Sequence, residues 1–359
     1  MRGIKIIKRT INLKCAISLF LLFTAIYISI SQHNMISADK IEGVNFIGPY
    51  EDILEPYMME DIKMVHAEWI ALIPGAIMSR TTLEISTKNN RIGWYESAAG
   101  IEKSIQISQN LGFRIMLKPH IVLQYVEDIP TGAIDKTDNT EWRGSYVASD
   151  ENDWKLLEDN YRNFIIPYAQ MAEDYQVELF CIGTELREFV ISRPYYWNQL
   201  IEEIRKIYTG KICYSANWDG FEKIPLWDKL DYVGLNSYFP LSKKDTPSIK
   251  NLNNKWKEVK KSIYTLSQEK NKKIIFTEFG WRNVDASGKE PWIHNDGLHK
   301  SNYKIQSNLY SAFFESIWNE PWVAGGFCWD WNYKTVDVSD TNFHINNKPA
   351  AKILAKYYH

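Results

Sequence analysis

The sequence has little net charge, and this shortage excludes a class of partners. Its 42 lysines and arginines nearly balance its 44 aspartates and glutamates, which leaves a formal net charge of −2. A chain this close to neutrality offers no broad electrostatic surface for nucleic acid or for an acidic membrane. We therefore expect no nucleic-acid partner.

Cysteine is also scarce, with four in 359 residues. Cys15 lies near the N-terminus, and Cys181, Cys213 and Cys328 stand inside predicted strands without paired spacing. A disulfide framework or a structural metal site usually shows regular spacing of its cysteines. We predict three small buried side chains, no required metal and no cofactor.

Other missing features concern domain organisation. The chain has no internal repeat beyond a strand and helix alternation, no low-complexity linker, and no glycine-rich phosphate loop after its last two predicted strands. The missing phosphate loop disfavours a phosphate-using barrel enzyme. A length of 359 residues suits one large α/β domain with insertions, and we expect a monomer.

Residues 1–38 form a predicted segment of their own. Basic residues precede an uncharged run from Cys15 to Ile30, a layout typical of a signal peptide or an uncleaved signal anchor. The run is slightly shorter than the roughly 20 residues of a comfortable membrane span, so cleavage and anchoring both remain open. We expect an exported protein whose membrane contact, if any, is this segment, followed by one domain over residues 39–359. The basic residues are Arg2, Lys5, Lys8, Arg9 and Lys14.

Short β-rich segments alternate with amphipathic stretches along the rest of the chain. One helix is predicted after Asp150 as its cap, another from Pro194 to a point before Gly210, and a third over Asn251–Lys273. Eight strands separated by helices predict parallel pairing and a closed (β/α)8 TIM barrel. The eight predicted strands are Gly43–Phe46, Trp69–Ile73, Arg114–Lys118, Glu178–Ile182, Lys211–Tyr214, Tyr232–Leu235, Lys273–Thr277 and Gly325–Trp329.

Two glutamates, Glu185 and Glu278, each follow a short apolar run at the predicted C-terminal end of a strand. A charged side chain is costly to hold there unless it is paired or used. The C-terminal strand ends form the active face of a TIM barrel, so these carboxylates should face one another across its mouth. Glycoside hydrolases use such a pair of carboxyl groups to cleave a glycosidic bond. A structural salt bridge at a strand end is the alternative.

Seven motifs, in order from about Gly43 to Tyr333, make the chain similar to glycoside hydrolase family 113, a family of retaining (β/α)8-barrel glycosidases in the large clan A. The resemblance implies a β-mannan-cleaving activity with Glu185 as general acid/base and Glu278 as nucleophile. It implies a polysaccharide or oligosaccharide as substrate. The motifs are Gly43-Val44-Asn45-Phe46, Ala71-Leu72-Ile73-Pro74, Met116-Leu117-Lys118-Pro119-His120, Trp142-Arg143-Gly144, Ile182-Gly183-Thr184-Glu185-Leu186, Thr277-Glu278-Phe279-Gly280 and Trp329-Asp330-Trp331.

One position departs from the wider clan. Many clan members carry an asparagine directly before the acid/base, and Thr184 stands there in this chain, as in the Gly-Thr-Glu pattern of the family. The hydrogen bond that this asparagine gives to the sugar 2-hydroxyl must then come from another residue. Asn45 and Asn236 qualify by their positions near strand ends.

Further candidate substrate contacts lie at the other strand ends. His120 either hydrogen-bonds a sugar hydroxyl or packs under its loop, and Tyr238 either donates to Glu278 or is an ordinary packing residue. Trp329 and Trp331 are predicted to share one face of the last strand. In the resemblance a tryptophan here is the floor under the sugar whose bond is cleaved, and Trp329 is the predicted one.

The long irregular stretches Ile121–Asp150 and Trp281–His299 are predicted walls of the substrate cleft. Trp142 and Arg143, in the first stretch, suggest an aromatic wall beside a hydrogen-bonding guanidinium. Trp218 and Trp281 follow the fifth and seventh predicted strands and are further candidate sugar contacts, although tryptophans are often core residues. Asp330 is either a third acidic group of the site or a loop anchor.

Three other functions remain open. The same carboxylates would serve a β-glucan hydrolase or a transglycosylase. The axial 2-hydroxyl of mannose is recognised by other side chains, so the carboxylate pair does not identify the sugar. A non-catalytic carbohydrate-binding barrel is also possible in this fold. After the second strand, Pro74 to Met78 lack the aromatic residues that relatives often carry. The sugar is therefore less well defined than the reaction.

Overall fold

The computed structural model describes residues 40–88, 92–124, 142–293, 300–334 and 340–358. The chain divides into two units, Met1–Lys40 and Ile41–His359, and the second contains the whole of the fold described below. The predicted signal segment lies outside the described residues. Within them, no helix is long and apolar enough to cross a membrane.

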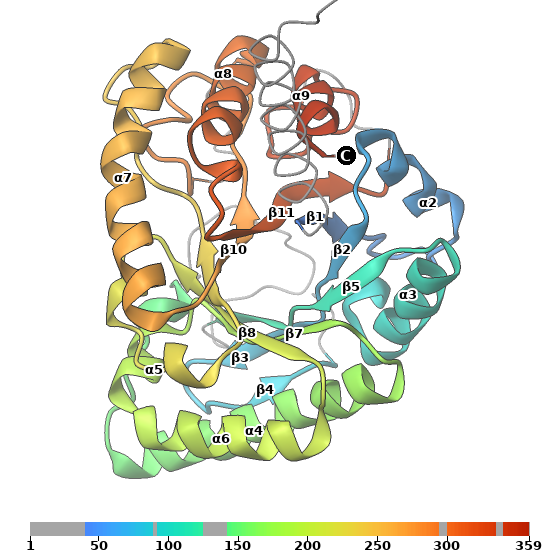
Figure 1. The fold of residues 1–359 in the computed structure, drawn as a ribbon. Helices are drawn as coiled ribbons and strands as arrows, with labels where there is room; N and C mark the ends of the chain where they lie inside the picture. Colours follow the sequence, from blue (N-terminus) through green and yellow to red (C-terminus); the bar gives the residue numbers. More distant parts are fainter. Residues whose placement is uncertain (1–39, 89–91, 125–141, 294–299, 335–339, 359) are drawn as a thin grey trace, which may run out of the picture. The chain divides into compact units, whose positions relative to one another are not determined.

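Eight parallel strands close into a barrel, in the order β1-β11-β10-β9-β8-β7-β5-β2 (Figure 1). Each predicted strand segment overlaps one of these strands, which confirms the (β/α)8 fold. The barrel strands are β1 (Ile41–Ile47), β2 (Trp69–Leu72), β5 (Arg114–Leu117), β7 (Leu179–Thr184), β8 (Lys211–Asn217), β9 (Val233–Asn236), β10 (Ile274–Phe279) and β11 (Val323–Asn332).

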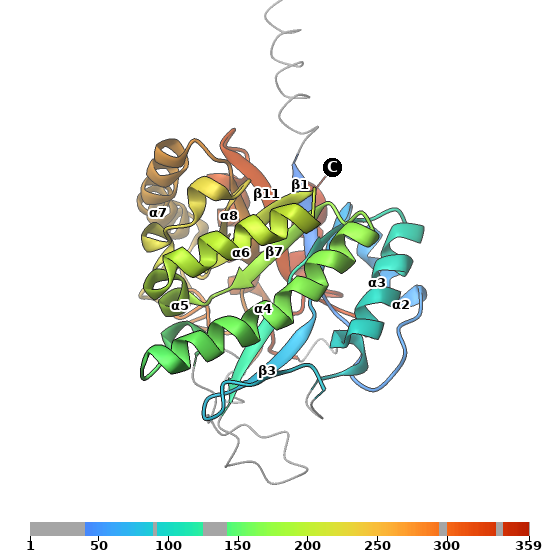
Figure 2. The ribbon, with the colours of Figure 1, turned by 90° about the horizontal axis from the view of Figure 1, so that it is seen from below.

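Helices surround the barrel, and their ends follow the expected signals. The side chain of Asp150 accepts hydrogen bonds from the backbone amides of Asn152 and Asp153, so it caps the predicted helix. Helices α4 and α6 lie side by side next to β7 (Figure 2). The helices are α2 (Tyr57–Glu60), α3 (Ala98–Asn110), α4 (Glu151–Asp174), α5 (Arg187–Ser192), α6 (Pro194–Ile207), α7 (Ile249–Lys270), α8 (Tyr303–Phe313) and α9 (Pro349–Tyr357).

The strict alternation of strand and helix fails between β8 and β9. Every residue of this connection lies in the part of the chain that the structure describes. It contains two 3-10 turns, Phe221–Lys223 and Trp227–Lys229, in place of an α-helix. Phe221 and Trp227 are buried, and Trp227 packs against Tyr214 of β8. The barrel is closed without a helix in this connection.

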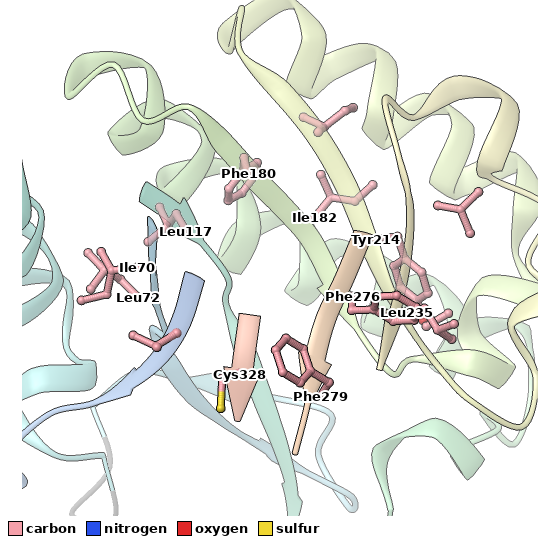
Figure 3. Packing of buried hydrophobic residues seen from close by; sticks show 14 of the residues in the cluster. Ile70, Leu72, Leu117, Phe180, Ile182, Tyr214, Leu235, Phe276, Phe279 and Cys328 are labelled. Atoms are coloured by element: carbon pink, nitrogen blue, oxygen red, sulfur yellow. The ribbon is translucent and has the colours of Figure 1, made fainter. Parts of the chain in front are cut away.

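The barrel wall separates two apolar layers. Along β7, Leu179 and Cys181 belong to the interior cluster, whereas Phe180 and Ile182 pack in the larger cluster outside the barrel (Figure 3). This is the period of two that a strand buried on both faces requires. Cys181, Cys213 and Cys328 are buried free thiols, as predicted.

A small second sheet was not predicted. It has the strand order β4-β3-β6, from β4 (Ile85–Ser86), β3 (Gly75–Ser79) and β6 (His120–Gln124). β3 and β6 follow the C-terminal ends of β2 and β5 and pair in parallel, with Gly75 opposite His120. The segment from Ile121, predicted as irregular, therefore begins as a strand. Its pairing joins segments distant in sequence, which local propensity does not reveal.

Candidate active site

Glu185 stands directly after β7 with a left-handed backbone, φ 56°. A non-glycine residue in this region costs about 1–2 kcal/mol, so the surrounding structure must hold it there. Its backbone amide donates to the carbonyl of Ser215 on the neighbouring strand at 2.8 Å. This turn directs the carboxylate toward three hydrogen-bond donors at the C-terminal end of the barrel.

Two of those donors come from one short turn, Trp142-Arg143-Gly144. The Trp142 Nε1 and an Arg143 guanidinium nitrogen each lie 3.1 Å from Glu185 Oε2. Arg143 also donates to the carbonyl oxygens of Thr184 and Ile121, which fixes its plane. A Cβ on Gly144 would lie 2.4 Å from the Trp142 ring and 2.6 Å from the Glu185 carbonyl oxygen. Only glycine lets this turn approach Glu185 so closely.

Glu278, on β10, is more deeply buried and has a cationic partner. Lys118 Nζ lies 2.7 Å from Glu278 Oε1, with side-chain exposures of 0% and 6%. The Tyr238 hydroxyl donates to Glu278 Oε2 at 2.7 Å, the hydrogen bond that the sequence predicted. Burial, and then the charge of Glu278, raises the pKa of Tyr238 well above its usual range, so the phenol stays protonated.

His120 lies beside this ion pair without joining it. Its Nε2 is 3.8 Å from Glu278 Oε1, a distance at which a protonated ring would form a salt bridge. Burial, with the nearby Lys118 and Arg143 cations, lowers the pKa of His120 well below its usual range. The ring is therefore neutral. Its buried Nε2 has no hydrogen-bond partner among the described residues.

Asn236 connects the two carboxylates. It is the register partner of Glu278 on the adjacent strand, and its Nδ2 donates to Glu185 Oε1 at 3.0 Å. Its Oδ1 accepts from the hydroxyls of Ser215 and Thr277, which fixes the amide orientation. Asn236 therefore adjoins both glutamates at the C-terminal end of the barrel, Glu185 through its side-chain amide and Glu278 through the strand pairing.

Trp329, on β11, completes this group. Its ring stacks with that of His120 at 6.1 Å and an interplanar angle of 10°, and Lys118 Nζ lies 5.1 Å from its centroid. Gly280 makes room for this strand, because a Cβ there would lie 2.0 Å from the Trp329 carbonyl oxygen. Trp329 is partly exposed, as a sugar-stacking residue must be.

The sequence of this chain matches the family model of Glycoside Hydrolase Family 113 over residues 48–348. The chain belongs to that family. It is therefore a glycoside hydrolase, and the predicted barrel and reaction class are confirmed together. Glu185 and Glu278 both lie within the matched residues.

Solved structures share the fold of this family 113 member at low sequence identity. A GH113 β-1,4-mannanase described as a complex structure matches with a TM-score of 0.74 at 20% identity, covering 89% of this chain and 99% of that one. The GH113 β-mannanase AaManA from Alicyclobacillus acidocaldarius in complex with ManMIm gives 0.74 and 20%, covering 90% and 98%. A β-glucuronidase from Faecalibacterium prausnitzii gives 0.58 and 15%, covering 89% of this chain and 48% of its own. A search of curated protein sequences gave no match.

Three sequence predictions need correction in this family 113 barrel. Asn45 is fully buried, with its Nδ2 donating to backbone carbonyls including that of Thr277, so it braces strands instead of facing a sugar. Trp281 is also fully buried, packed against Tyr310 and Phe313. Both are core positions.

Trp331 does not share a face with Trp329. Val44 pairs with Cys328 and Phe46 with Trp331, so β11 carries one extra residue between the pairs. Such a bulge reverses the alternation of side chains. Trp331 is buried in the outer cluster and lines a cavity of about 270 Å³ whose lining includes neither glutamate.

Asp330 anchors a loop. Its carboxylate is hydrogen-bonded to His344 Nδ1, and its backbone carbonyl accepts a hydrogen bond from the backbone amide of Ile345. Burial acts to lower the pKa of His344, but the hydrogen bond and charge of Asp330 give a net raised pKa. The loop-anchor interpretation of Asp330 is the one that this geometry supports.

Sequence reasoning missed Lys118 as the partner of Glu278. A usable signal existed, since Lys118 ends the apolar run Ile115-Met116-Leu117 just as the two glutamates end theirs. It also missed Trp292, which stacks against the half-buried Trp218. No pattern in the sequence links these two residues.

Proposed function

We propose that this chain cleaves β-1,4-mannosidic bonds in mannan or manno-oligosaccharides by a retaining, double-displacement reaction. One observation carries the proposal: two glutamates at the ends of β7 and β10 both adjoin Asn236, each with its own set of donors. The GH113 mannanases of similar fold support the choice of sugar.

In the first step Glu278 attacks the anomeric carbon. The glycosidic carbon–oxygen bond breaks, an ester forms between the sugar and Glu278, and Glu185 gives its proton to the leaving oxygen. Lys118 and Tyr238 both donate to Glu278, so they orient its oxygens for the attack. Their fixed positions leave the nucleophile a single orientation.

In the second step Glu185 takes a proton from water as the water oxygen attacks the anomeric carbon. The ester bond to Glu278 breaks, and both carboxyl groups return to their starting states. Trp142, Arg143 and Asn236 all donate to Glu185, so they orient the carboxylate that this step needs.

Sugar hydroxyls require donors and acceptors at the same end of the barrel. Thr184 is buried with its hydroxyl directed at the Pro119 carbonyl at 3.5 Å, so it does not replace the clan asparagine. We assign that role to Asn236, whose Nδ2 donates to Glu185 Oε1. The unpartnered Nε2 of the neutral His120 is a second contact for a hydroxyl, and Trp329 is the stacking floor.

The decisive test compares Glu278→Ala and Glu185→Ala on β-mannan and on an activated aryl β-mannoside. Glu278→Ala should lose nearly all turnover on both substrates. Glu185→Ala should lose far more on mannan, because an activated aryl group departs without protonation. Glu222→Ala, an exposed glutamate outside the site, is the matched control.

Azide should restore turnover to Glu278→Ala and give a product of inverted configuration. Equal loss by Glu185→Ala on both substrates would contradict its role as the acid. Products from cello-oligosaccharides instead of manno-oligosaccharides would keep the carboxylate chemistry and replace the sugar. Binding of mannan without turnover would leave a carbohydrate-binding barrel.

We also propose that the protein is exported. The support is the basic start of the chain followed by the uncharged run from Cys15 to Ile30. Fractionation of cells that express the full chain tests this proposal. Protein found only in the cytoplasm would contradict it.

A further inference from the structure

Two tryptophans from separate loops stack on one another beyond the carboxylates. Trp218 follows β8, and Trp292 lies in the long segment after β10. Their ring centroids are 5.2 Å apart with an interplanar angle of 18°. Trp292 remains 39% exposed. A large aromatic ring held by stacking and still open to solvent is typical of a binding surface.

The pair is held from behind by other contacts. Phe239 packs edge-on against Trp218, with centroids 6.0 Å apart. The segment that carries Trp292 crosses the loop after β9, where Leu241 and Ser242 both donate to the Gly288 carbonyl. Arg282 donates to the carbonyl of Ile293, next to Trp292. Three loops therefore converge on the two rings.

Two lines of contact place the pair on the Glu185 side of the site. Asn217, directly before Trp218, is the register partner of Asn236, which donates to Glu185. Asp219, directly after Trp218, pairs with Arg187.

The guanidinium of Arg187 in turn lies 4.8 Å from the centroid of Trp142, whose Nε1 donates to Glu185. Lys118 and Trp329 contact Glu278 or its partners instead. Glu185, the proposed acid, protonates the oxygen of the sugar that leaves first, so a contact on the Glu185 side suits that sugar.

We propose that Trp218 and Trp292 form a stacking platform for a sugar on the leaving-group side of the cleaved bond. The platform rests on the proposed function and deepens it. It takes the apolar face of a β-linked pyranose and selects substrates with at least one further sugar beyond that bond. The same surface then binds sugar acceptors that compete with water for the glycosyl-enzyme ester.

The test uses Trp292→Ala in the full chain, because Trp292 is exposed and its removal spares the core. Two substrates are compared: mannohexaose, which reaches the platform, and β-mannobiosyl fluoride, whose fluoride leaving group leaves the platform empty. A stacked aromatic contact is worth about a factor of ten. We expect kcat/KM to fall about 10-fold on mannohexaose and to stay unchanged on the fluoride. Trp292→Phe should recover most of the loss.

Tyr195→Ala, which removes a 75% exposed aromatic on α6, is the matched control and should match wild type on both substrates. Unchanged cleavage of mannohexaose by Trp292→Ala would overturn the platform. Equal loss on both substrates would also overturn it, since that pattern indicates a structural role. A wild type that cleaves neither substrate would overturn the proposed function instead. The platform is then decided by calorimetry with mannohexaose, where equal affinities of wild type and Trp292→Ala would refute it.

Discussion

The ion pair between Lys118 and Glu278 gives the most direct test of the site, through Lys118→Met. Methionine keeps most of the side-chain volume and removes the charge. Unit charges 2.7 Å apart attract by about 6 kcal/mol at an effective dielectric constant of ~20, and the cost of removing both from water cancels part of this. What the substitution leaves is a buried carboxylate with no cation.

Removing one partner of a buried pair typically costs about 3–5 kcal/mol of unfolding free energy, and we expect that cost for Lys118→Met. Glu278→Gln should cost a similar amount, because it leaves an ammonium group with 0% exposure unpaired. The double variant removes both charges together. It should cost less than the sum of the single variants by about 2–3 kcal/mol.

Urea unfolding at neutral pH, followed by near-UV circular dichroism, measures all four proteins. Lys118→Met should also lose at least about 100-fold in kcat/KM on mannan, because Glu278, the proposed nucleophile, loses one of its two direct donors. Tyr195→Ala serves again as a control for both measurements. Additive costs in the double variant would refute the coupling, and full activity in Lys118→Met would refute the claim that this cation prepares Glu278.

Two further predictions concern the neighbours of the carboxylates. Gly144→Ala should reduce kcat/KM about 100-fold, because its Cβ would displace the Trp142 ring from Glu185, and an unchanged rate would contradict the close packing. His344 has a raised folded-state pKa, so its bond to Asp330 contributes fully below the unfolded pKa of about 6.5 and is lost as pH rises through the folded value. His344→Gln should therefore destabilise the protein by about 1.5–3 kcal/mol near pH ~5.5 and by less above pH ~8, and a pH-independent difference in urea unfolding would contradict this.

The barrel could be predicted because its signals are local. Each strand is a short apolar run, and a capping residue, Asp150, marks the N-terminus of helix α4. The interruptions were harder to predict. The sheet of β3, β4 and β6 and the turns between β8 and β9 depend on pairings and burial that only the closed barrel creates.

The carboxylates were predictable for a different reason. A charged residue at the end of an apolar strand is expensive anywhere except at a site, and Glu185 and Glu278 both stand in that position. The same argument, applied evenly, would have found Lys118. Only acidic residues were considered as candidates at strand ends, so Lys118, the cation that pairs with the buried Glu278, was missed.

The aromatic residues show where such reasoning stops. Trp218 and Trp281 have the same apparent placement, just beyond a strand end, and yet Trp218 is partly exposed whereas Trp281 is buried in the core. A tryptophan is stable in either setting, because burial in the core and stacking at the surface both stabilise its ring. What separates them is whether a second loop, here the one that carries Trp292, brings another ring to the solvent side. Substrate contacts made by tryptophan therefore depend on loop packing, whereas contacts made by charge leave a mark in the sequence itself.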